Sequence, residues 1–449
     1  MHKKFDLNKL KPIAQLIEQV ENKTISLSSY YSHLLSKTNQ FNPILNTYIS
    51  FNEKVILEKL QKYQEKKQDD QSRKQILRGI PFNIKDCFIS KDYPTTFGVK
   101  EGTQYTKDKN SNIITIFEKE GAILFGKTSI PAYAYDVQTF NEVVGITNNP
   151  WNEKYSSGGS TGGGAVSVAT GMIPIAIGSD FAGSIRIPAH FCGVKGYIPS
   201  NGFQYLSGHY PDVYLDQDYK FIVGQIGFLS NFVFDFTRIH KVLHKGIQKI
   251  NDFVIHDYNI LVSFQDEYIP ISEEYKDHIQ NVIDVLKINQ LESTVKFPNE
   301  FSFKNMGSLH AKLMNISFDK EKNKDYSGIE ELKEQKGEYI NRMDKFLHNR
   351  FWILPVSSTP AIKHNLEHKP IVVDGKSIPY WRAMIHYTRP FNILTNPSIT
   401  LPIGKNREGL PIGIQILAET GNDLGLLRFA EFLESNLGSI GFPPGYEIN

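Results

Sequence analysis

One glycine-rich stretch, residues 155–196, limits what this chain can fold into more than any other. It reads YSSGGSTGGGAVSVATGMIPIAIGSDFAGSIRIPAHFCGVKG and holds ten of the chain's 33 glycines. Ser160 lies in the segment GGSTGG and Ser184 lies in DFAGSIR. Glycine permits positive φ and close backbone approach, so both serines are expected among backbone N–H groups that face a small anionic centre. The residues between them predict a helix that begins near Ser160 and a strand that ends near Ser184.

Three other interpretations of this stretch fit its residues less well. A flexible linker would not contain an apolar run such as IPIAIG. A phosphate-binding loop requires GxxxxGK[ST], or a strand followed by GxGxxG, and neither pattern is present. A nucleophile elbow requires GxSxG after a strand, and both serines miss that pattern.

A candidate lysine precedes the stretch, in the segment LRGIPFNIKDCF. Apolar residues occupy every second position from 80 to 84, which predicts a strand. Successive strand side chains point to opposite faces, so Lys85 and Asp86 are expected to face apart, with Asp86 capping the following turn. This separation matters because an adjacent carboxylate would favour the charged form of the lysine.

The stretch resembles the amidase signature family, the Ser-cisSer-Lys hydrolases. The family's GGSSGG and G[ST]DxGGSIRxPA blocks correspond here to GGSTGG and GSDFAGSIRIPA, and the two serines are 184 − 160 = 24 residues apart, which is the family spacing. Lys85 stands at the lysine of the family's G[IV]PxxxKD block. The resemblance is strong over residues 79–200 and 385–435 and thin over residues 232–345.

The resemblance implies an α/β fold, a single large amidase domain over residues 1–449 with a mixed central β-sheet covered by helices. Its expected parts are an N-terminal helical layer at about 7–70, the signature core at about 79–200, a variable half that forms the substrate pocket at about 201–350, and closing strands and a helix at about 351–435. Helical periodicity predicts helices over residues 7–21, 27–35 with Ser26 as N-cap, 55–67, 113–119, 273–291 and 329–347.

The resemblance also implies a mechanism that needs no cofactor and no metal. Ser184 would attack the amide carbonyl and form an acyl-enzyme, Ser160 would relay the proton, and Lys85 would accept it. Lys85 must then be neutral at rest, which requires burial that lowers its pKa toward neutrality. The family's bridging serine follows a cis peptide bond, which here would be Gly159–Ser160.

The expected oxyanion hole consists of the backbone N–H groups of Phe181, Ala182, Gly183 and Ser184. The family usually has glycine where this chain has Ala182, and alanine disfavours positive φ. Arg186 binds a substrate carboxylate in some relatives, and a structural ion pair is an equal alternative for it here.

Histidines offer two other chemistries. His190 lies six residues after Ser184, so a Ser-His-Asp triad stays open at this stage. Residues 364–368 read HNLEH and satisfy the H-x-x-E-H zinc pattern. That motif needs a helix and a third ligand, whereas Pro360 and Pro370 bracket a short segment here, so no metal site is expected.

Composition narrows the partners. A formal net charge of +2 gives no reason to expect nucleic acid or a membrane surface. Two cysteines, Cys87 and Cys192, form no disulfide framework and suit a reducing compartment. The N-terminal residues lack a signal-peptide pattern, and no apolar run reaches about 18 residues. We therefore expect a cytoplasmic protein that binds a small-molecule amide, with a homodimer compatible with the sequence.

Two alternatives to an amidase remain open. The first is the glutamine-hydrolysing component of a tRNA-dependent amidotransferase, in which, as the resemblance implies, an aspartate three residues before the threonine of the TxPAN block helps to hold the glutamine amide. Here the block is TRPFN, Thr388 is the threonine, and the earlier position is Ile385. An apolar wall at Ile385 would suit an uncharged amide. The second alternative is a non-catalytic binding protein on the same fold.

Overall fold

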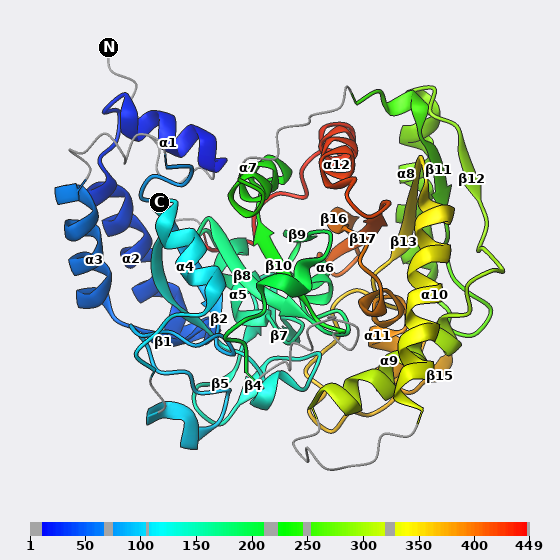
Figure 1. Ribbon diagram of the computed structural model, residues 1–449, viewed down its shortest axis with the longest axis horizontal. Coiled ribbons are helices and arrows are strands. Elements are labelled where there is room, and N and C mark those ends of the chain that lie inside the picture. The colour runs from blue at the N-terminus through cyan, green and yellow to red at the C-terminus, as the bar shows by residue number, and fades with distance from the viewer. Residues whose placement is uncertain are drawn as a thin grey trace.

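An 11-stranded sheet runs through the centre of the molecule, in the order β1-β3-β2-β8-β10-β9-β16-β17-β13-β11-β12 (Figure 1). The computed structural model describes residues 11–66, 75–104, 107–210, 223–245, 253–318 and 328–446. The sheet strands are β1 Tyr48–Phe51, β2 Pro81–Lys85, β3 Ile123–Thr128, β8 Ile175–Asp180, β9 Lys195–Ile198, β10 Gln225–Ser230, β11 Asn259–Val262, β12 Ser293–Val295, β13 Arg350–Pro355, β16 Ser398–Lys405 and β17 Pro411–Leu417.

Helices surround this sheet, and short two-stranded sheets form outside it. The helices are α1 Ile13–Glu21, α2 Leu27–Leu45, α3 Glu53–Lys66, α4 Asn112–Lys119, α5 Gly162–Ala169, α6 Arg186–Cys192, α7 Val233–Leu243, α8 Glu273–Ile288, α9 Phe303–Phe318, α10 Ile329–Leu347, α11 Tyr380–Ile385 and α12 Asp423–Leu437. The small sheets pair β4 Phe140–Asn141 with β5 Gly145–Ile146, β6 Asn148–Asn149 with β7 Asn152–Ser156, and β14 Ile371–Val373 with β15 Lys376–Ile378.

The sheet is mixed, which confirms the fold class predicted from the sequence. Strand β2 pairs in parallel with both β3 and β8, and β11 pairs in parallel with β12 and β13. The strands between β8 and β13 pair antiparallel. Every residue of β2, β8 and β17 is buried, which explains their near-continuous apolar runs, because both faces of such strands are covered.

The helix predictions agree with the structure in position and differ in length. Ser26 is the N-cap of α2 and exchanges hydrogen bonds with Ser29, as its position before the helix suggests. This helix continues ten residues beyond the predicted end at 35, because Phe41 and Leu45 are buried and packing outweighs the unfavourable Pro43 near its end. The part of the first predicted helix before residue 11 lies outside the described residues.

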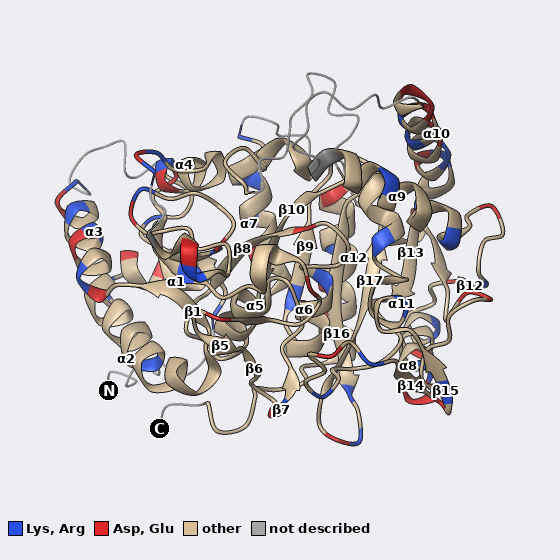
Figure 2. Ribbon diagram, turned by 90° about the horizontal axis from the view of Figure 1, so that it is seen from below, with Lys and Arg blue, Asp and Glu red and all other residues tan. Residues whose placement is uncertain are grey.

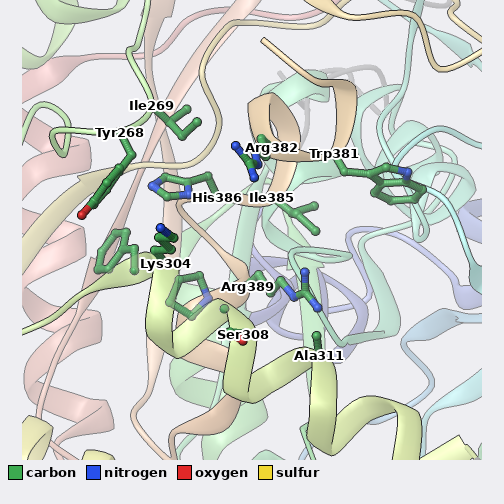
Figure 3. Close-up of a pocket in the computed structure, with 13 residues that line it drawn as sticks. Tyr268, Ile269, Lys304, Ser308, Ala311, Trp381, Arg382, Ile385, His386 and Arg389 are labelled. Atoms are coloured by element: carbon green, nitrogen blue, oxygen red, sulfur yellow. The ribbon is translucent and has the colours of Figure 1, made fainter.

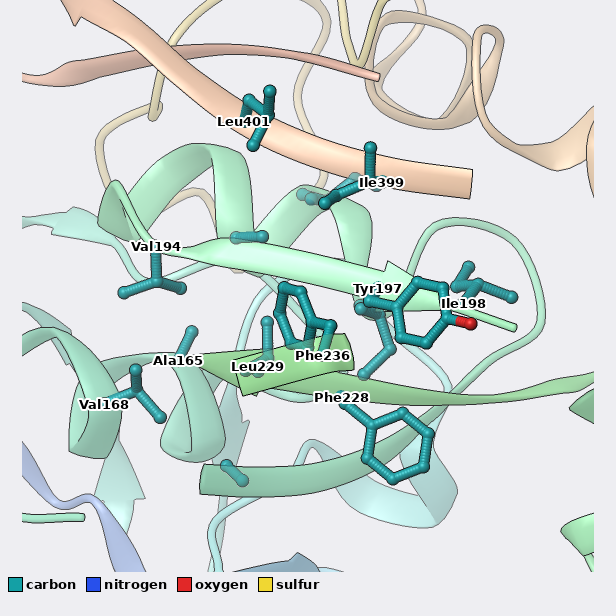
Figure 4. Close-up of a cluster of buried hydrophobic side chains, with 14 of the residues drawn as sticks. Ala165, Val168, Val194, Tyr197, Ile198, Phe228, Leu229, Phe236, Ile399 and Leu401 are labelled. Carbon is teal, nitrogen blue, oxygen red and sulfur yellow. The ribbon is translucent and has the colours of Figure 1, made fainter. Parts of the chain in front are cut away.

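The core beside the catalytic strands joins segments that are far apart in the chain (Figure 4). Tyr197 and Phe228 pair across β9 and β10, and Ile399 of β16 lies next in register to Tyr197. Phe228 occupies the place where relatives usually have proline, and it stacks on Phe117 of α4 at 5.9 Å. The Tyr197 hydroxyl donates to Asp423 at the start of α12, so this polar group is satisfied inside the core.

Charged residues of both signs are interspersed along the surface helices, as α3 and α10 show (Figure 2). Within the described ranges, no helix combines the length and the apolarity that a membrane crossing requires.

Alternation along β2 sends Lys85 and Asp86 to different neighbours, as predicted. Asp86 forms an ion pair with Lys127 of β3 at 2.9 Å, and both side chains are fully buried. Asp86 does not cap the turn that follows it. It accepts instead from the amide and hydroxyl of Thr96, ten residues further on. Burial raises the pKa of Asp86 and lowers that of Lys127, and the ion pair opposes both shifts.

We expect Lys127→Met to lower the free energy of unfolding by roughly 3–5 kcal/mol, because it strands Asp86 in the core without its cation. Urea denaturation measures this change. Lys85→Met is the matched control: Lys85 is equally buried, and among the described residues no carboxylate lies within ion-pair distance of it, so a smaller loss is expected. Equal losses in the two variants would show that the Asp86 pair contributes nothing specific.

Candidate active site

Three segments bring the sequence-predicted residues together at the carboxyl ends of two parallel strands. Lys85 is the last residue of β2, which pairs with β8. Ser184 lies in the loop between β8 and α6, and Ser160 lies just before α5. The carboxyl ends of parallel strands are the common location of ligand sites in open α/β sheets.

A continuous chain of hydrogen bonds links the lysine to both serines. The Nζ of Lys85 lies 2.8 Å from the Oγ of Ser160, whose hydroxyl donates to the Oγ of Ser184 at 3.0 Å. The same Nζ lies 3.1 Å from both the Oγ and the carbonyl oxygen of Ser179. The peptide bond Gly159–Ser160 is cis.

Burial sets the protonation of this lysine. Lys85 is 1% exposed. Burial lowers its pKa below the ordinary value of 10.5, and electrostatic interactions with Cys87 and Asp180 oppose that shift only in part. At the other end of the hydrogen-bond chain, Ser160 and Ser184 line a cavity of about 660 Å³. The arrangement therefore joins a buried amine with a lowered pKa to a hydroxyl that a ligand can reach.

The loop before Ser184 places its positive φ at Gly183, not at Ala182. Gly183 has φ +125°, and a Cβ there would lie 2.5 Å from the hydroxyl of Thr388. Ala182 is not among the described residues with positive φ. The sequence concern about alanine at this position therefore does not apply, because the residue that needs glycine is still glycine.

The backbone amides of this loop are only partly available to a substrate. The amide of Gly183 donates to Asp180 Oδ1 at 2.7 Å, so in this structure it is already engaged within the protein. The hydroxyl of Thr388 donates to the carbonyl of Ala182 at 2.6 Å and fixes the orientation of that peptide. Phe181 and Ala182 stay predicted oxyanion donors, together with the amide of Ser184.

Arg186 forms a structural ion pair, which decides between the two sequence alternatives. Its guanidinium contacts Asp180 at 2.9 and 3.1 Å, and also Asn392 and Gln415, and it is 1% exposed. Burial alone would raise the pKa of Asp180, but Arg186 and several hydrogen bonds hold it well below its usual range. This network fixes both ends of the loop from Asp180 to Arg186.

His209 is a site residue that sequence reasoning did not single out. Its Nε2 lies 2.8 Å from the Oγ of Ser179 and 3.0 Å from the Sγ of Cys87, and its ring lines the cavity. Ser179 in turn contacts Lys85, so His209 is one residue removed from the amine. The only sequence signal was its place in a loop rich in Tyr, His and Asp, most of which lies outside the described residues.

His310 and Arg389 were missed as well, because no motif contains them. Arg389 Nε donates to His310 Nδ1 at 2.9 Å, so Nε2 carries the proton and faces the carbonyl of Phe181 at 2.5 Å. Burial and the Arg389 cation lower the pKa of His310 to about 3. A neutral imidazole thus supports the loop that precedes Ser184.

The other histidines do not assemble a competing site. His190 accepts from the amide of Gly413 and contacts the carbonyl of Thr359, and burial lowers its pKa to about 4. His364 and His368 contact Glu153 and Asp136 respectively. In the described parts of the chain, no group of three or more His, Cys, Asp or Glu side chains is placed to hold a metal ion.

Comparison with known proteins supports the same family over most of the chain. A sequence-family profile described as Amidase matches residues 31–267 and 262–427. The glutamine-hydrolysing component (GatA) of glutamyl-tRNA(Gln) amidotransferase from Legionella pneumophila is 36% identical over 190 residues, 42% of this chain and 39% of that protein. Its counterpart from Coxiella burnetii is 35% identical over 192 residues, 43% and 39% respectively. These matches span about two fifths of the relatives' own length.

Solved structures resemble the whole fold. The 6-aminohexanoate cyclic dimer hydrolase complexed with substrate has a TM-score of 0.78 at 23% identity, covering 99% of this chain and 100% of that one. A bacterial aryl acylamidase of the amidase signature enzymes has a TM-score of 0.79 at 21% identity, with coverages of 95% and 96%. Fatty acid amide hydrolase has a TM-score of 0.80 at 17% identity, with coverages of 97% and 86%. At such identities the likeness shows the fold alone. The profile match along most of the sequence establishes that this chain belongs to the amidase signature family.

Proposed function

We propose that this chain hydrolyses a carboxylic amide to an acid and ammonia or an amine, through an acyl-enzyme on Ser184. The observation that supports the proposal is the chain of hydrogen bonds from Lys85 through Ser160 to Ser184, at 2.8 and 3.0 Å. It begins at a buried amine with a lowered pKa and ends at the wall of a cavity. A nucleophile activated by an adjacent base is the arrangement that acyl transfer requires.

Acylation uses all three side chains. The Oγ of Ser184 attacks the amide carbonyl and gives its proton to Ser160, whose own proton passes to the neutral Nζ of Lys85. When the tetrahedral intermediate collapses, the C–N bond breaks and the leaving nitrogen takes a proton back along the same path. Water then attacks the Ser184 ester, again with its proton accepted through Ser160, and releases the acid.

Charge on the tetrahedral oxygen is the second requirement. Backbone N–H donors fixed before the reaction stabilise such an oxyanion without reorganisation. The amides of Phe181, Ala182 and Ser184 are proposed for this role. The Asp180–Arg186 pair, Thr388 and His310 hold the loop that contains them. Gly183 could take part only by sharing the hydrogen that it now donates to Asp180.

The glutamine-hydrolysing amidotransferase component is the alternative that the curated relatives favour. Against it stands Ile385, an apolar residue where those proteins use a carboxylate for the glutamine amide. In the structure Ile385 lines a second cavity and not the cavity that contains Ser184. The expectation of an apolar wall is wrong for that second cavity, because Arg382, His386 and Arg389 line it too.

The pH dependence of turnover tests the proposed base. Lys85 accepts a proton only when neutral, and its pKa lies below 10.5, so the rate should rise with pH through that lowered pKa and then level off. Lys85→Ala should remove this limb and lower kcat by about 10²–10⁴-fold. The measurement is ammonia release from a panel of aliphatic, aryl and amino-acid amides, with Lys54→Ala, an exposed lysine of α3, as control. A profile that is flat from acid to alkaline pH would argue against a neutral lysine.

The same panel separates the amidase from the amidotransferase component. We expect glutamine to be a poor substrate, because a site that lacks the hydrogen bond to a polar substrate group forfeits a large factor in kcat/KM. Ile385→Asp should improve glutamine turnover relative to Ile385→Asn, its neutral counterpart. Glutamine as the best substrate, with ammonia release stimulated by tRNA, ATP and partner proteins, would instead support the rival.

A further inference from the structure

A second cavity of about 400 Å³ lies beside the active site (Figure 3). Its walls come from α9, from α11 with the residues that follow it, and from the segment at Tyr268 and Ile269. The residues that line it are Tyr268, Ile269, Phe303, Lys304, Gly307, Ser308, Ala311, Trp381, Arg382, Ile385, His386, Arg389 and Pro390. None of these residues has a role in the reaction proposed above, except that Arg389 supports His310.

The lining contains three cations and no carboxylate. Lys304, Arg382 and Arg389 all line the cavity. Among the residues that the structure describes, none of the three forms an ion pair. Helix α9 adds no acidic residue of its own, since its sequence is FKNMGSLHAKLMNISF.

The carboxylate beside this cavity is already occupied. Asp266 contacts His386 Nε2 at 2.5 Å and accepts from the amides of Tyr268 and Ile269 at 3.1 and 2.9 Å. Arg389 is half-buried, and burial lowers its pKa. A partly desolvated guanidinium without a carboxylate partner is costly unless an anion compensates it.

The remaining lining is apolar and aromatic. Phe303 and Ile385 are buried, Trp381 is half-buried, and Lys304 Nζ lies 5.7 Å from the centre of the Tyr268 ring. A pocket that combines an apolar body with a few convergent charges selects ligands of matching chemistry. Such a ligand has an apolar or aryl body and one anionic group.

Three links connect this cavity to the active site. Arg389 donates to His310, which contacts the carbonyl of Phe181 in the loop before Ser184. The rings of Trp381, in this cavity, and Tyr135, in the catalytic cavity, have centres 6.2 Å apart. Helix α9 also lines both cavities, through Ala311 on one side and Met314 on the other.

We propose that this cavity binds a small organic anion, a carboxylate or phosphate on an apolar body, through Lys304, Arg382 and Arg389. Guanidinium groups bind such planar or tetrahedral oxyanions through paired charge-assisted hydrogen bonds. The anion is either a distal group of the amide substrate or a separate ligand, and its chemistry is the same in both cases.

Calorimetric titration with 3-phenylpropionate tests the binding directly, with the neutral 3-phenylpropanol as its counterpart. The Ser184→Ala protein is used, so that the result does not depend on turnover. We expect the carboxylate to bind at least about tenfold more tightly than the alcohol, and to bind more weakly as salt rises. The double variant Lys304→Gln/Arg382→Gln should abolish this preference, and both side chains are exposed, so the fold should persist. Lys312→Gln, an exposed lysine of α9 outside the cavity, is the matched control.

Kinetics identify the source of the anion. If it belongs to the substrate, a carboxylate-bearing amide should lose kcat/KM in the double variant while its methyl ester does not. If it is a separate ligand, 3-phenylpropionate should change turnover of the ester without competing with it. Equal binding of acid and alcohol, or an unchanged preference in the double variant, would overturn the proposal. Carboxylate binding without turnover of any amide would overturn the proposed function alone.

Discussion

A lysine buried at the end of β2, with no carboxylate in contact among the described residues, is the constraint on which the catalytic arrangement depends. Burying an ammonium group is costly unless a charge compensates it, and the lowered pKa of Lys85 is the consequence. The next residue, Asp86, could have compensated it but points away to Lys127. Strand alternation therefore separates two roles: it keeps one lysine away from a carboxylate for proton transfer and pairs the other for stability.

The surroundings of Ser184 are fixed by charge and by backbone geometry. The buried pair of Asp180 and Arg186 closes the base of the loop, and Asp180 also accepts the amides of Gly183 and Ile185. Glycine at 183 allows the φ of +125° where a side chain would strike Thr388. Preorganisation of this kind places donors before any charge develops, which is how oxyanion sites lower the barrier to acyl transfer.

Lys85, Ser160 and Ser184 could be predicted from the sequence because each lies in a local motif with fixed spacing. The orientation of Asp86 followed from strand periodicity, although its partners Thr96 and Lys127 did not. His209 and His310 could not be predicted, because their roles arise from contacts with residues 30 and 129 positions away. Helix α9 was missed for a related reason: it lies in the half of the chain where the resemblance is thin, so neither motif nor partner was visible. The position of Ile385 was predicted along the chain, but its surroundings depend on Arg382 and Arg389, which only the fold brings beside it.

Covalent labelling with a fluorophosphonate, followed by peptide mass spectrometry, tests the central claim that Ser184 is the nucleophile that Lys85 activates. The account predicts a single adduct on Ser184, faster labelling as pH rises, and slow labelling of Lys85→Met. It also predicts no adduct on Ser184→Ala, whose turnover should fall by at least about 10⁴-fold. Ser167→Ala, which removes a buried hydroxyl of α5 that bonds only to the carbonyl of Gly164 among the described contacts, should label normally. Undiminished labelling of Ser184→Ala, or an adduct on another residue of the wild-type protein, would contradict the account.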